Sequence, residues 1–244
     1  MSCHKVPTYL QIRKAIADDI DNQNLEHNQR LPPERALCEQ YGVTRVTLRR
    51  SLRLLENDGK IYRKNRSGWY VCPSRLRYNP LKYASILSYA REQGFEVTTQ
   101  LVSQERLTPP ENIRNILQLE KNQTVVRALR MRSLNNRPAV VENFYMNPEV
   151  LIDIEKQDLS QSISKLLVHH YGLNKIRYEI EILPTTLGPA EADILDIAAG
   201  TNGMNIFRTV YDDQGRTVEC DVEHWRNDAL LIEASVNLEL DPNP

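Results

Sequence analysis

The 244-residue sequence predicts an α+β protein built from two domains. The first observation is a split of charge: residues 1–77 hold 15 Lys and Arg against 8 Asp and Glu, whereas residues 78–244 hold 16 against 24. The second is a pattern of three helices and a hairpin at the start, followed by a strand–helix–hairpin pattern that occurs twice. A charge split of this kind suggests that the first domain meets a polyanion while the second has another role.

Helical spacing of apolar residues defines the first two helices. Tyr9, Ile12, Ile16 and Ile20 predict a helix over about 8–22. Pro33 suits the first turn of a short second helix, because the missing N–H of proline is not needed there. We expect this second helix to end at Gly42, with its inner face formed by Ala36, Leu37 and Tyr41.

A third helix concentrates arginines outside its apolar stripe. Thr44 is its predicted N-cap and Gly59 closes it. The buried stripe consists of Leu48, Ser51, Leu52 and Leu55, and at 100° per residue the arginines fall outside it. The strand-like pieces "KIYRK" and "GWYV" follow, joined by the polar turn "NRS", and predict a small hairpin.

Three helices and a basic hairpin in this order predict a winged helix-turn-helix. The start of the third helix would lie at base edges in the major groove, where an arginine fork can pair with guanine; its residues are Thr44, Arg45, Thr47 and Arg49. The other cationic side chains are predicted to contact phosphate, with solvated surface as the alternative for some of them; they are Arg50, Arg53, Arg63, Lys64 and Arg66.

The stretches "YLQIRKAIADDI", "LPPERALCEQYGVTRVTLRRSLRLLENDGKI" and "GWYV" resemble the DNA-binding domain of GntR-family bacterial transcription regulators. The resemblance covers about the first 72 residues and implies DNA contacts by Arg35, Arg45, Thr47 and Arg49. The usual wing tip of that family reads Gly-x-Gly-Thr, whereas this chain has "NRSGWYV" with the single Gly68. We expect residues 65–68 of the wing to reach the minor groove.

The second domain is predicted to follow a proline-bounded basic linker, with domains at 1–72 and 81–244 and the linker at 73–80. Its two repeats are a strand over 95–107, a helix over 110–117 and a hairpin over 125–146, then a strand over 176–187, a helix over 189–197 and a hairpin over 205–226. A further helix is expected over 160–171. The natural result is one antiparallel sheet with helices packed on it.

The two hairpins align residue by residue, which places Glu142 and Asp221 at equivalent positions. Because side chains alternate along a strand, Arg130 and Arg132 can share one face with Glu142. Two arginines on one face suit a carboxylate or phosphate ligand. An exposed, salt-bridged sheet face explains the same residues equally well.

This half of the chain, from about Tyr78 onward, resembles the effector-binding UTRA domain of the HutC subfamily, whose architecture is similar to chorismate lyase. The pieces that carry the resemblance are "ALRMRSLNNRPAVVENFYM", "LSQSISKLL" and "DDQGRTVECDVEHWRND". It implies a small, often anionic effector bound by Arg130, Arg132, Glu142, Ser162, Ser164, Glu219, Asp221 and Trp225. "SGWYV", "AREQGFE" and "VEHWRNDALLIE" look most like phosphonate-utilisation regulators, which favours an aminophosphonate, with arginines and helix-start hydroxyls for the phosphonate and carboxylates for the ammonium.

The expected function is a cytoplasmic, homodimeric repressor that binds a palindromic operator in double-stranded DNA and responds to an effector, without a cofactor or metal. An alternative is a small-anion-converting enzyme of chorismate lyase-like fold carrying a DNA-binding head. Against catalysis, no nucleophile elbow, metal-ligand spacing or glycine-rich phosphate loop occurs in the sequence. A general DNA-packaging protein is disfavoured because the acidic second half offers no further cationic surface. No apolar run approaches the length of about 20 residues that spans a membrane.

Overall fold

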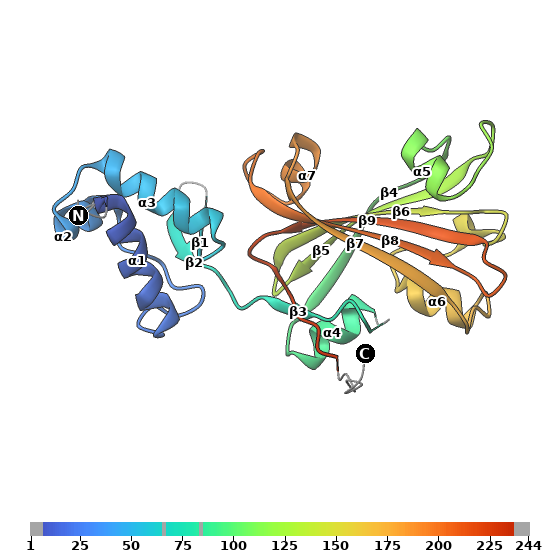
Figure 1. Cartoon of the computed structure of the whole chain (residues 1–244), viewed down its shortest axis with the longest axis horizontal. Coiled ribbons are helices and arrows are strands. Elements are labelled where there is room, and N and C mark those ends of the chain that lie inside the picture. Colours follow the sequence, from blue (N-terminus) through green and yellow to red (C-terminus); the bar gives the residue numbers. More distant parts are fainter. Residues whose placement is uncertain (1–6, 65–66, 83–84, 237–244) are drawn as a thin grey trace, which may run out of the picture. The chain divides into compact units, whose positions relative to one another are not determined.

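The computed structural model describes residues 7–64, 67–82 and 85–236. The chain divides into two compact units, 1–75 and 76–244 (Figure 1). Each unit has hydrophobic clusters of its own. Thus the predicted α+β fold with a helix-turn-helix and an antiparallel sheet is confirmed. No helix in the described ranges has both the length and the apolar character that crossing a membrane requires.

The first unit is a three-helix cluster with a two-stranded wing. Its elements are α1 (Thr8–Asp21), α2 (Glu34–Tyr41), α3 (Arg45–Asn57), β1 (Ile61–Lys64) and β2 (Gly68–Val71). Pro33 lies at the N-cap of α2, one position before the helix in which it was expected. Gly42 ends α2 in the left-handed conformation, at φ +62°, which turns the chain sharply toward α3.

The predicted stripe of α3 forms the centre of this unit. Leu48, Ser51, Leu52 and Leu55 are all buried. The Ser51 hydroxyl donates a hydrogen bond of 2.9 Å to the carbonyl of Tyr9 and so ties α3 to α1. Because the apolar stripe faces inward, the arginines of α3 face outward.

The second unit is built on a six-stranded antiparallel sheet in the order β4-β5-β6-β9-β8-β7. Its strands are β4 (Val97–Leu107), β5 (Val125–Leu134), β6 (Arg137–Met146), β7 (Arg177–Thr186), β8 (Asn202–Tyr211) and β9 (Thr217–Arg226). Each predicted strand–helix–hairpin repeat supplies three strands, and the two repeats meet where β6 pairs with β9. The first hairpin, β5–β6, spans the predicted range 125–146, and the second, β8–β9, begins at Asn202, just before its predicted range of 205–226.

Short helices cover both faces of the sheet (Figure 1). One face packs against α5 (Glu111–Ile116) and α7 (Pro189–Ile194). The opposite face packs against α4 (Ile86–Glu92), α6 (Ile163–His169) and the 3₁₀ helix η1 (Ile154–Lys156).

A small parallel pair of strands was not expected. The predicted linker at 73–80 contains β3 (Leu76–Tyr78), which pairs with β10 (Leu230–Ile232) near the end of the described chain. Leu76 and Tyr78 are buried in the second unit's core. This part of the linker is therefore an ordered element of the second unit.

Candidate functional sites

The leading end of α3 presents an exposed group of polar and cationic side chains. Thr44 is the N-cap, and its hydroxyl oxygen accepts a hydrogen bond of 3.4 Å from the backbone N–H of Thr47. Arg45 is exposed and, within the described residues, forms no ion pair. The cap fixes the first turn, so that Arg45 projects from a rigid point of the backbone.

Val46 beside it is 81% exposed, an unusual position for a large apolar side chain. We did not anticipate a role for it from the sequence. The sequence did contain a signal, because Val46 is an apolar residue that lies outside the inward-facing stripe of α3. An exposed aliphatic group at the start of a recognition helix suits contact with a thymine methyl group.

Two of the other predicted DNA-contacting arginines, Arg49 and Arg35, pair with carboxylates within the unit. Arg49 Nε donates to Glu34 Oε2 at 2.9 Å, and Glu34 also accepts a hydrogen bond of 3.3 Å from the indole of Trp69. Although burial alone would raise the pKa of Glu34, these two donors hold it below its usual range. Arg35 pairs with Glu39 at 3.0 Å. These contacts orient guanidinium groups that remain exposed to solvent.

Aromatic rings hold two more cations. The Arg50 guanidinium lies 3.8 Å from the ring centroid of Tyr9, and Arg50 Nη2 donates to the Tyr9 hydroxyl at 3.1 Å. Arg63 in the wing lies 6.0 Å from the Trp69 ring centroid. Arg53 is exposed without an ion pair in the described part of the chain. Arg66 and Asn65 lie outside the described residues.

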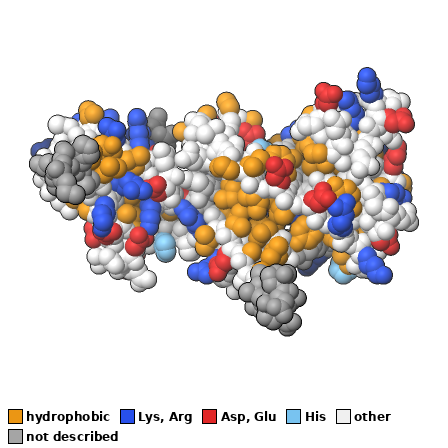
Figure 2. Space-filling view, in the orientation of Figure 1, with side chains coloured by type: hydrophobic (Ala, Val, Ile, Leu, Met, Phe, Trp, Pro, Cys, Tyr) orange, Lys and Arg blue, Asp and Glu red, His pale blue; other side chains and the backbone are white. Residues whose placement is uncertain are grey.

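Gly68 opens β2 with a φ of +111°. Residues other than glycine rarely adopt this backbone conformation, so the wing requires a glycine at this position. A Cβ at this position would lie 3.5 Å from the guanidinium of Arg30, at ordinary contact distance. Figure 2 shows Lys and Arg side chains alongside acidic ones on the visible face of this unit.

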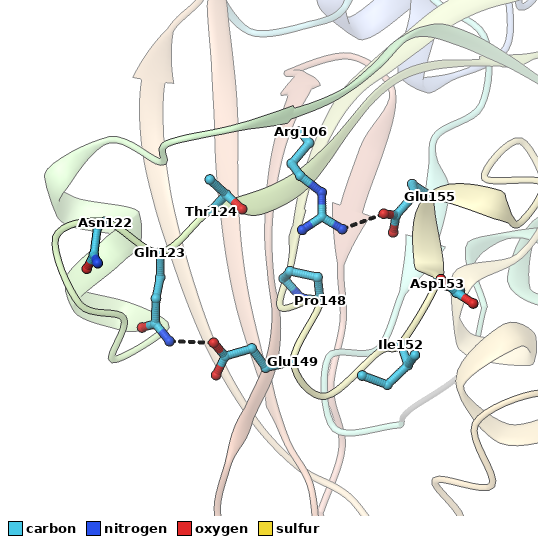
Figure 3. Close-up of a pocket in the computed structure, with 9 residues that line it drawn as sticks. All are labelled: Arg106, Asn122, Gln123, Thr124, Pro148, Glu149, Ile152, Asp153 and Glu155. Atoms are coloured by element: carbon cyan, nitrogen blue, oxygen red, sulfur yellow. Dashed lines mark hydrogen bonds and ion pairs between the residues drawn. The ribbon is translucent and has the colours of Figure 1, made fainter.

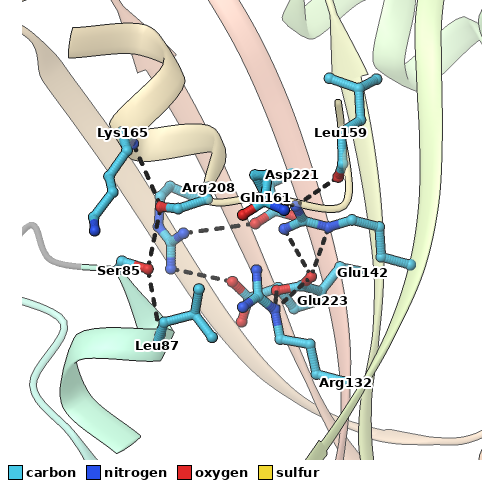
Figure 4. Close-up of polar contacts among 12 residues, drawn as sticks. Ser85, Leu87, Arg132, Glu142, Leu159, Gln161, Lys165, Arg208, Asp221 and Glu223 are labelled. Atoms are coloured by element: carbon cyan, nitrogen blue, oxygen red, sulfur yellow. Dashed lines mark hydrogen bonds and ion pairs between the residues drawn. The ribbon is translucent and has the colours of Figure 1, made fainter. Parts of the chain in front are cut away.

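The second unit contains a buried ionic cluster on the face of the sheet that α4 and α6 cover (Figure 4). Strands β5, β6, β9 and β8 contribute its charges, which cross-strand pairing brings together. The cluster consists of Arg130, Arg132, Glu142, Arg208, Glu219, Asp221 and Glu223.

Glu142 is the centre of one half of the cluster. Its carboxylate accepts hydrogen bonds from Arg130 Nε at 3.0 Å and from Arg132 Nε at 2.8 Å, and all three side chains are buried. Although burial would raise the pKa of Glu142, the two guanidinium groups hold it below its usual range. The sheet face is therefore salt-bridged, as one of the two sequence interpretations had it, but it is buried rather than exposed.

Arg130 also holds the segment before α6. Its Nη1 donates to the carbonyls of Leu159 at 3.0 Å and Gln161 at 2.8 Å, and its guanidinium lies 4.3 Å from the Phe144 ring centroid. Ser162 is the N-cap of α6 and donates a hydrogen bond of 3.3 Å to the hydroxyl of Ser85, the N-cap of α4. The starts of α4 and α6 thus meet over the cluster.

Arg208 is the centre of the other half. It lies 3.5 Å from Asp221 and 3.2 Å from Glu223, and its Nη2 donates to the Tyr78 hydroxyl at 2.8 Å. Burial lowers the pKa of Arg208, but the surrounding acidic groups, led by Glu223, outweigh it and raise the pKa above its usual range. For the neutral hydroxyl of Tyr78, by contrast, burial raises the pKa to about 12.

Arg208, Glu223 and Tyr78 were missed in the sequence, although the repeat held the signal for Arg208. Arg130 pairs across the first hairpin with Glu142, and Arg208 pairs across the second with Asp221. Arg208 is therefore the repeat equivalent of Arg130.

Two of the predicted effector residues lie differently from the rest. Trp225 is fully buried in the hydrophobic core, and its indole N–H donates to Glu223 Oε2 at 2.5 Å. It therefore meets the ionic cluster through Glu223. Ser164 is half-buried in the first turn of α6, and no hydrogen bond joins it to the described cluster residues.

An open cavity of about 410 Å³ lies elsewhere in the second unit (Figure 3). It contains none of the predicted effector residues. Its charged groups already pair, Arg106 with Glu155, while Gln123 donates to Glu149 at 2.6 Å. We place the candidate effector site at the buried ionic cluster because the cavity offers no comparable set of buried charges.

Comparisons with known proteins agree with the geometry of both units. Residues 8–71 match the model for bacterial regulatory proteins of the gntR family, and residues 92–230 match the UTRA domain. The uncharacterized HTH-type transcriptional regulator YihL of Escherichia coli K12 is 30% identical over 202 residues, 82% of this chain and 86% of that protein.

Two further relatives extend the comparison. The HTH-type transcriptional repressor NagR of Bacillus subtilis is 25% identical over 223 residues, 91% of this chain and 92% of that protein. The crystal structure of PhnF from Mycobacterium smegmatis has the same fold, with a TM-score of 0.64 at 21% identity over 93% of this chain and 100% of that chain. YihL and NagR are transcriptional regulators and not enzymes. The chain belongs to the GntR family of bacterial transcription regulators, in the HutC-type group that carries a UTRA domain.

Proposed function

We propose that the protein is a repressor that binds a palindromic DNA operator as a homodimer and releases it when a small anionic effector binds the buried ionic cluster. The observation that carries the DNA-binding part is the exposed Arg45 beside a capped helix start. An unpaired guanidinium on a rigid backbone can form a bidentate contact with guanine without first breaking an ion pair.

The remaining cations support this proposal by their distribution. Arg50, Arg53, Arg63 and Lys64 are exposed on α3 and the wing. Such side chains contact phosphates, which supply affinity and orientation without sequence preference. Arg35, Thr44, Thr47 and Arg49 complete the proposed interface at the start of α2 and α3.

A homodimer follows from the way a helix-turn-helix reads DNA, since two half-sites require two recognition helices. Strand β7 offers a surface for pairing because it is an outer strand of the sheet, and its Leu183 is 44% exposed. Figure 2 shows hydrophobic side chains gathered on the visible face of the second unit. The expected mass in solution is about twice 28.2 kDa.

The proposed effector is a small anion such as a phosphonate. Its support is the set of buried guanidinium groups on the sheet, of which Arg132 Nη1 lacks a hydrogen-bond partner among the described residues. A ligand that binds one arrangement of the cluster more tightly than another must shift DNA affinity by linkage.

The DNA-binding part is tested by selecting the preferred site from random duplexes and measuring affinity for selected and scrambled DNA at moderate salt. We expect Arg45→Ala to lose about 1–3 kcal/mol of discrimination between the two duplexes. Arg63→Ala, the matched control, should weaken both duplexes alike because it removes a phosphate contact. Equal affinity of the unaltered protein for selected and scrambled DNA would contradict the proposal.

A further inference from the structure

We propose that Val46 determines part of the sequence specificity of DNA binding, because its methyl groups contact the 5-methyl group of a thymine in each operator half-site. This inference rests on the proposed DNA-binding role of α3 and adds an apolar contact to it. The thymine lies within about two base pairs of the guanine assigned to Arg45, because consecutive Cα atoms are about 3.8 Å apart and consecutive base pairs about 3.4 Å.

The exposure of Val46 is the first observation. It is the most exposed large apolar side chain among the described residues, at 81%, and the other exposed ones of this kind lie in the second unit. Single exposed apolar residues are common on protein surfaces and need no explanation by themselves. Val46 differs from them by its place, since it is the second residue of the helix proposed to contact bases.

The surroundings of Val46 point to the partner. At about 100° per residue, it lies about 170° around the helix from the middle of the buried stripe that runs from Leu48 to Leu55. The residues beside it on this outward face are exposed arginines, namely Arg45, Arg49, Arg50 and Arg53. An apolar group among four cations suits a partner that carries an apolar group between negative charges. The major groove has this character, because the thymine methyl group lies between two phosphate backbones.

Two of these arginines are held so that they leave Val46 uncovered. Residues three and four positions further along a helix are neighbours on its surface, so the apolar stems of Arg49 and Arg50 could cover the valine. Arg49 instead donates to Glu34 of α2 at 2.9 Å, and the Arg50 guanidinium lies 3.8 Å from the ring centroid of Tyr9 in α1. The contacts that orient these two arginines therefore also keep the apolar spot open.

Local structure gives no reason for a valine at this position. Valine has a lower helix propensity than alanine, and the first turn of a helix favours acidic side chains. The cap itself is made by Thr44, whose hydroxyl oxygen accepts from the backbone N–H of Thr47 and lies 3.2 Å from the Thr47 hydroxyl. The cap thus occupies the hydroxyl groups of both threonines and leaves Arg45 and Val46 to meet bases.

Thymine is the base that an exposed valine can distinguish. Its 5-methyl group is the apolar feature of the major groove, whereas the other bases present hydrogen-bond donors and acceptors there. Removing one methyl group from water corresponds to about a fourfold gain in affinity. Together with a guanine bound by Arg45, this contact predicts a half-site in which guanine and thymine lie close together.

The test removes the thymine methyl group alone. The operator is selected from random duplexes with the full chain, and each thymine of one half-site is then replaced by deoxyuridine, one at a time and on either strand. Affinities are measured by fluorescence anisotropy at one salt concentration, because salt changes the affinity of every duplex. We expect replacement at one position near the guanine to weaken binding about fourfold. A selected half-site without thymine near the guanine, or no effect of any replacement there, would overturn the inference.

Matched variants locate the effect at Val46. Val46→Ser removes both methyl groups and should bind the thymine and deoxyuridine duplexes with equal affinity. It should unfold at the same temperature as the unaltered protein, because the side chain is exposed and serine and valine have similar helix propensities. Arg53→Ala on the same face is the control, since loss of a phosphate contact should weaken both duplexes alike and keep their ratio. A fourfold ratio retained in Val46→Ser would show that another residue contacts the methyl group.

The two proposals fail in different ways. If the unaltered protein binds selected and scrambled duplexes equally, the proposed DNA-binding function fails, and the role of Val46 fails with it. If the protein discriminates between these duplexes through Arg45 while neither deoxyuridine nor Val46→Ser changes the discrimination, base contact by α3 stands and the role of Val46 is wrong.

Discussion

Glu142 and Glu219 are buried carboxyl groups of the same ionic cluster that differ in their hydrogen-bond partners. Glu142 accepts hydrogen bonds from two guanidinium groups, whereas Glu219 Oε2 has no partner among the described residues. The same substitution by glutamine should therefore change stability in opposite directions at the two positions.

For Glu142→Gln we expect a loss of about 3–5 kcal/mol in the free energy of unfolding at pH 8, because the variant leaves two buried guanidinium groups without their carboxylate. Denaturant unfolding of the full chain provides the measurement. Glu105→Gln is the control, since Glu105 forms a half-exposed pair with Arg127 and should cost no more than about 1 kcal/mol. A loss at Glu142 as small as the control's would show that the buried pair contributes little.

For Glu219→Gln we expect a gain in stability that depends on pH. Burial raises the pKa of Glu219 from 4.5 to about 7. The folded protein therefore binds more protons than the unfolded chain between these values, and its stability falls as the pH rises from about 4.5 through 7. The difference corresponds to about 3 kcal/mol at most. The variant should be more stable than the unaltered protein at pH 8 and nearly equal to it at pH 4.5, and a gain independent of pH would contradict this cause.

At the scale of elements, the wing depends on one backbone conformation. Gly68 begins β2 at φ +111°, and Lys64 of β1 pairs with it across the hairpin. This pairing aligns β1 with β2 and sets the position of the wing's exposed cations relative to α3.

We expect Gly68→Ala to destabilise the first unit by about 1–3 kcal/mol. The cause is backbone strain at φ +111°, because the space around this position would accept a Cβ at ordinary contact distance. DNA affinity should fall for selected and scrambled duplexes alike, since the wing contributes phosphate contacts. Thermal unfolding and duplex titration of the same sample measure both effects. Ser74→Ala, an exposed position in the same unit, should change neither, and a stable Gly68→Ala variant would show that the wing tolerates another conformation.

The elements themselves were predictable wherever local patterns determine them. The apolar stripe Leu48–Leu52–Leu55 predicted α3, and the repeat predicted all six strands of the large sheet. Strands β3 and β10 were not predicted, because each is three residues long and they lie more than 150 residues apart in the chain. Their pairing comes from tertiary contact and leaves little trace in local periodicity.

At the scale of the whole molecule, the two units have separate hydrophobic cores. Ile12, Leu52 and Val71 belong to a cluster confined to the first unit, while the clusters that contain Trp225 and Val126 are confined to the second. Separate cores allow separate cooperative unfolding.

Calorimetry of the full chain should therefore show two unfolding transitions. A selected DNA duplex should raise the unfolding temperature of one transition, the one that belongs to the first unit, because a ligand stabilises only the folded state that binds it. Leu52→Ala, which creates a cavity in the first unit, identifies that transition by lowering it and leaving the other in place. A single transition that both changes shift together would show that the units unfold as one.

Sequence alone determined the architecture, because hydrophobic periodicity, helix caps and turn residues act over a few neighbouring positions. It also determined the charge split and the arginines of α3. Only the tertiary structure decided which charges meet. The sequence predicted a shared face for Arg130, Arg132 and Glu142. That both arginines form buried ion pairs with Glu142 depends on α4 and α6, which cover that face. Arg208 joins Asp221 and Glu223 because β8 lies beside β9. Buried charge depends on the full set of neighbours in space, and no stretch of sequence contains that set.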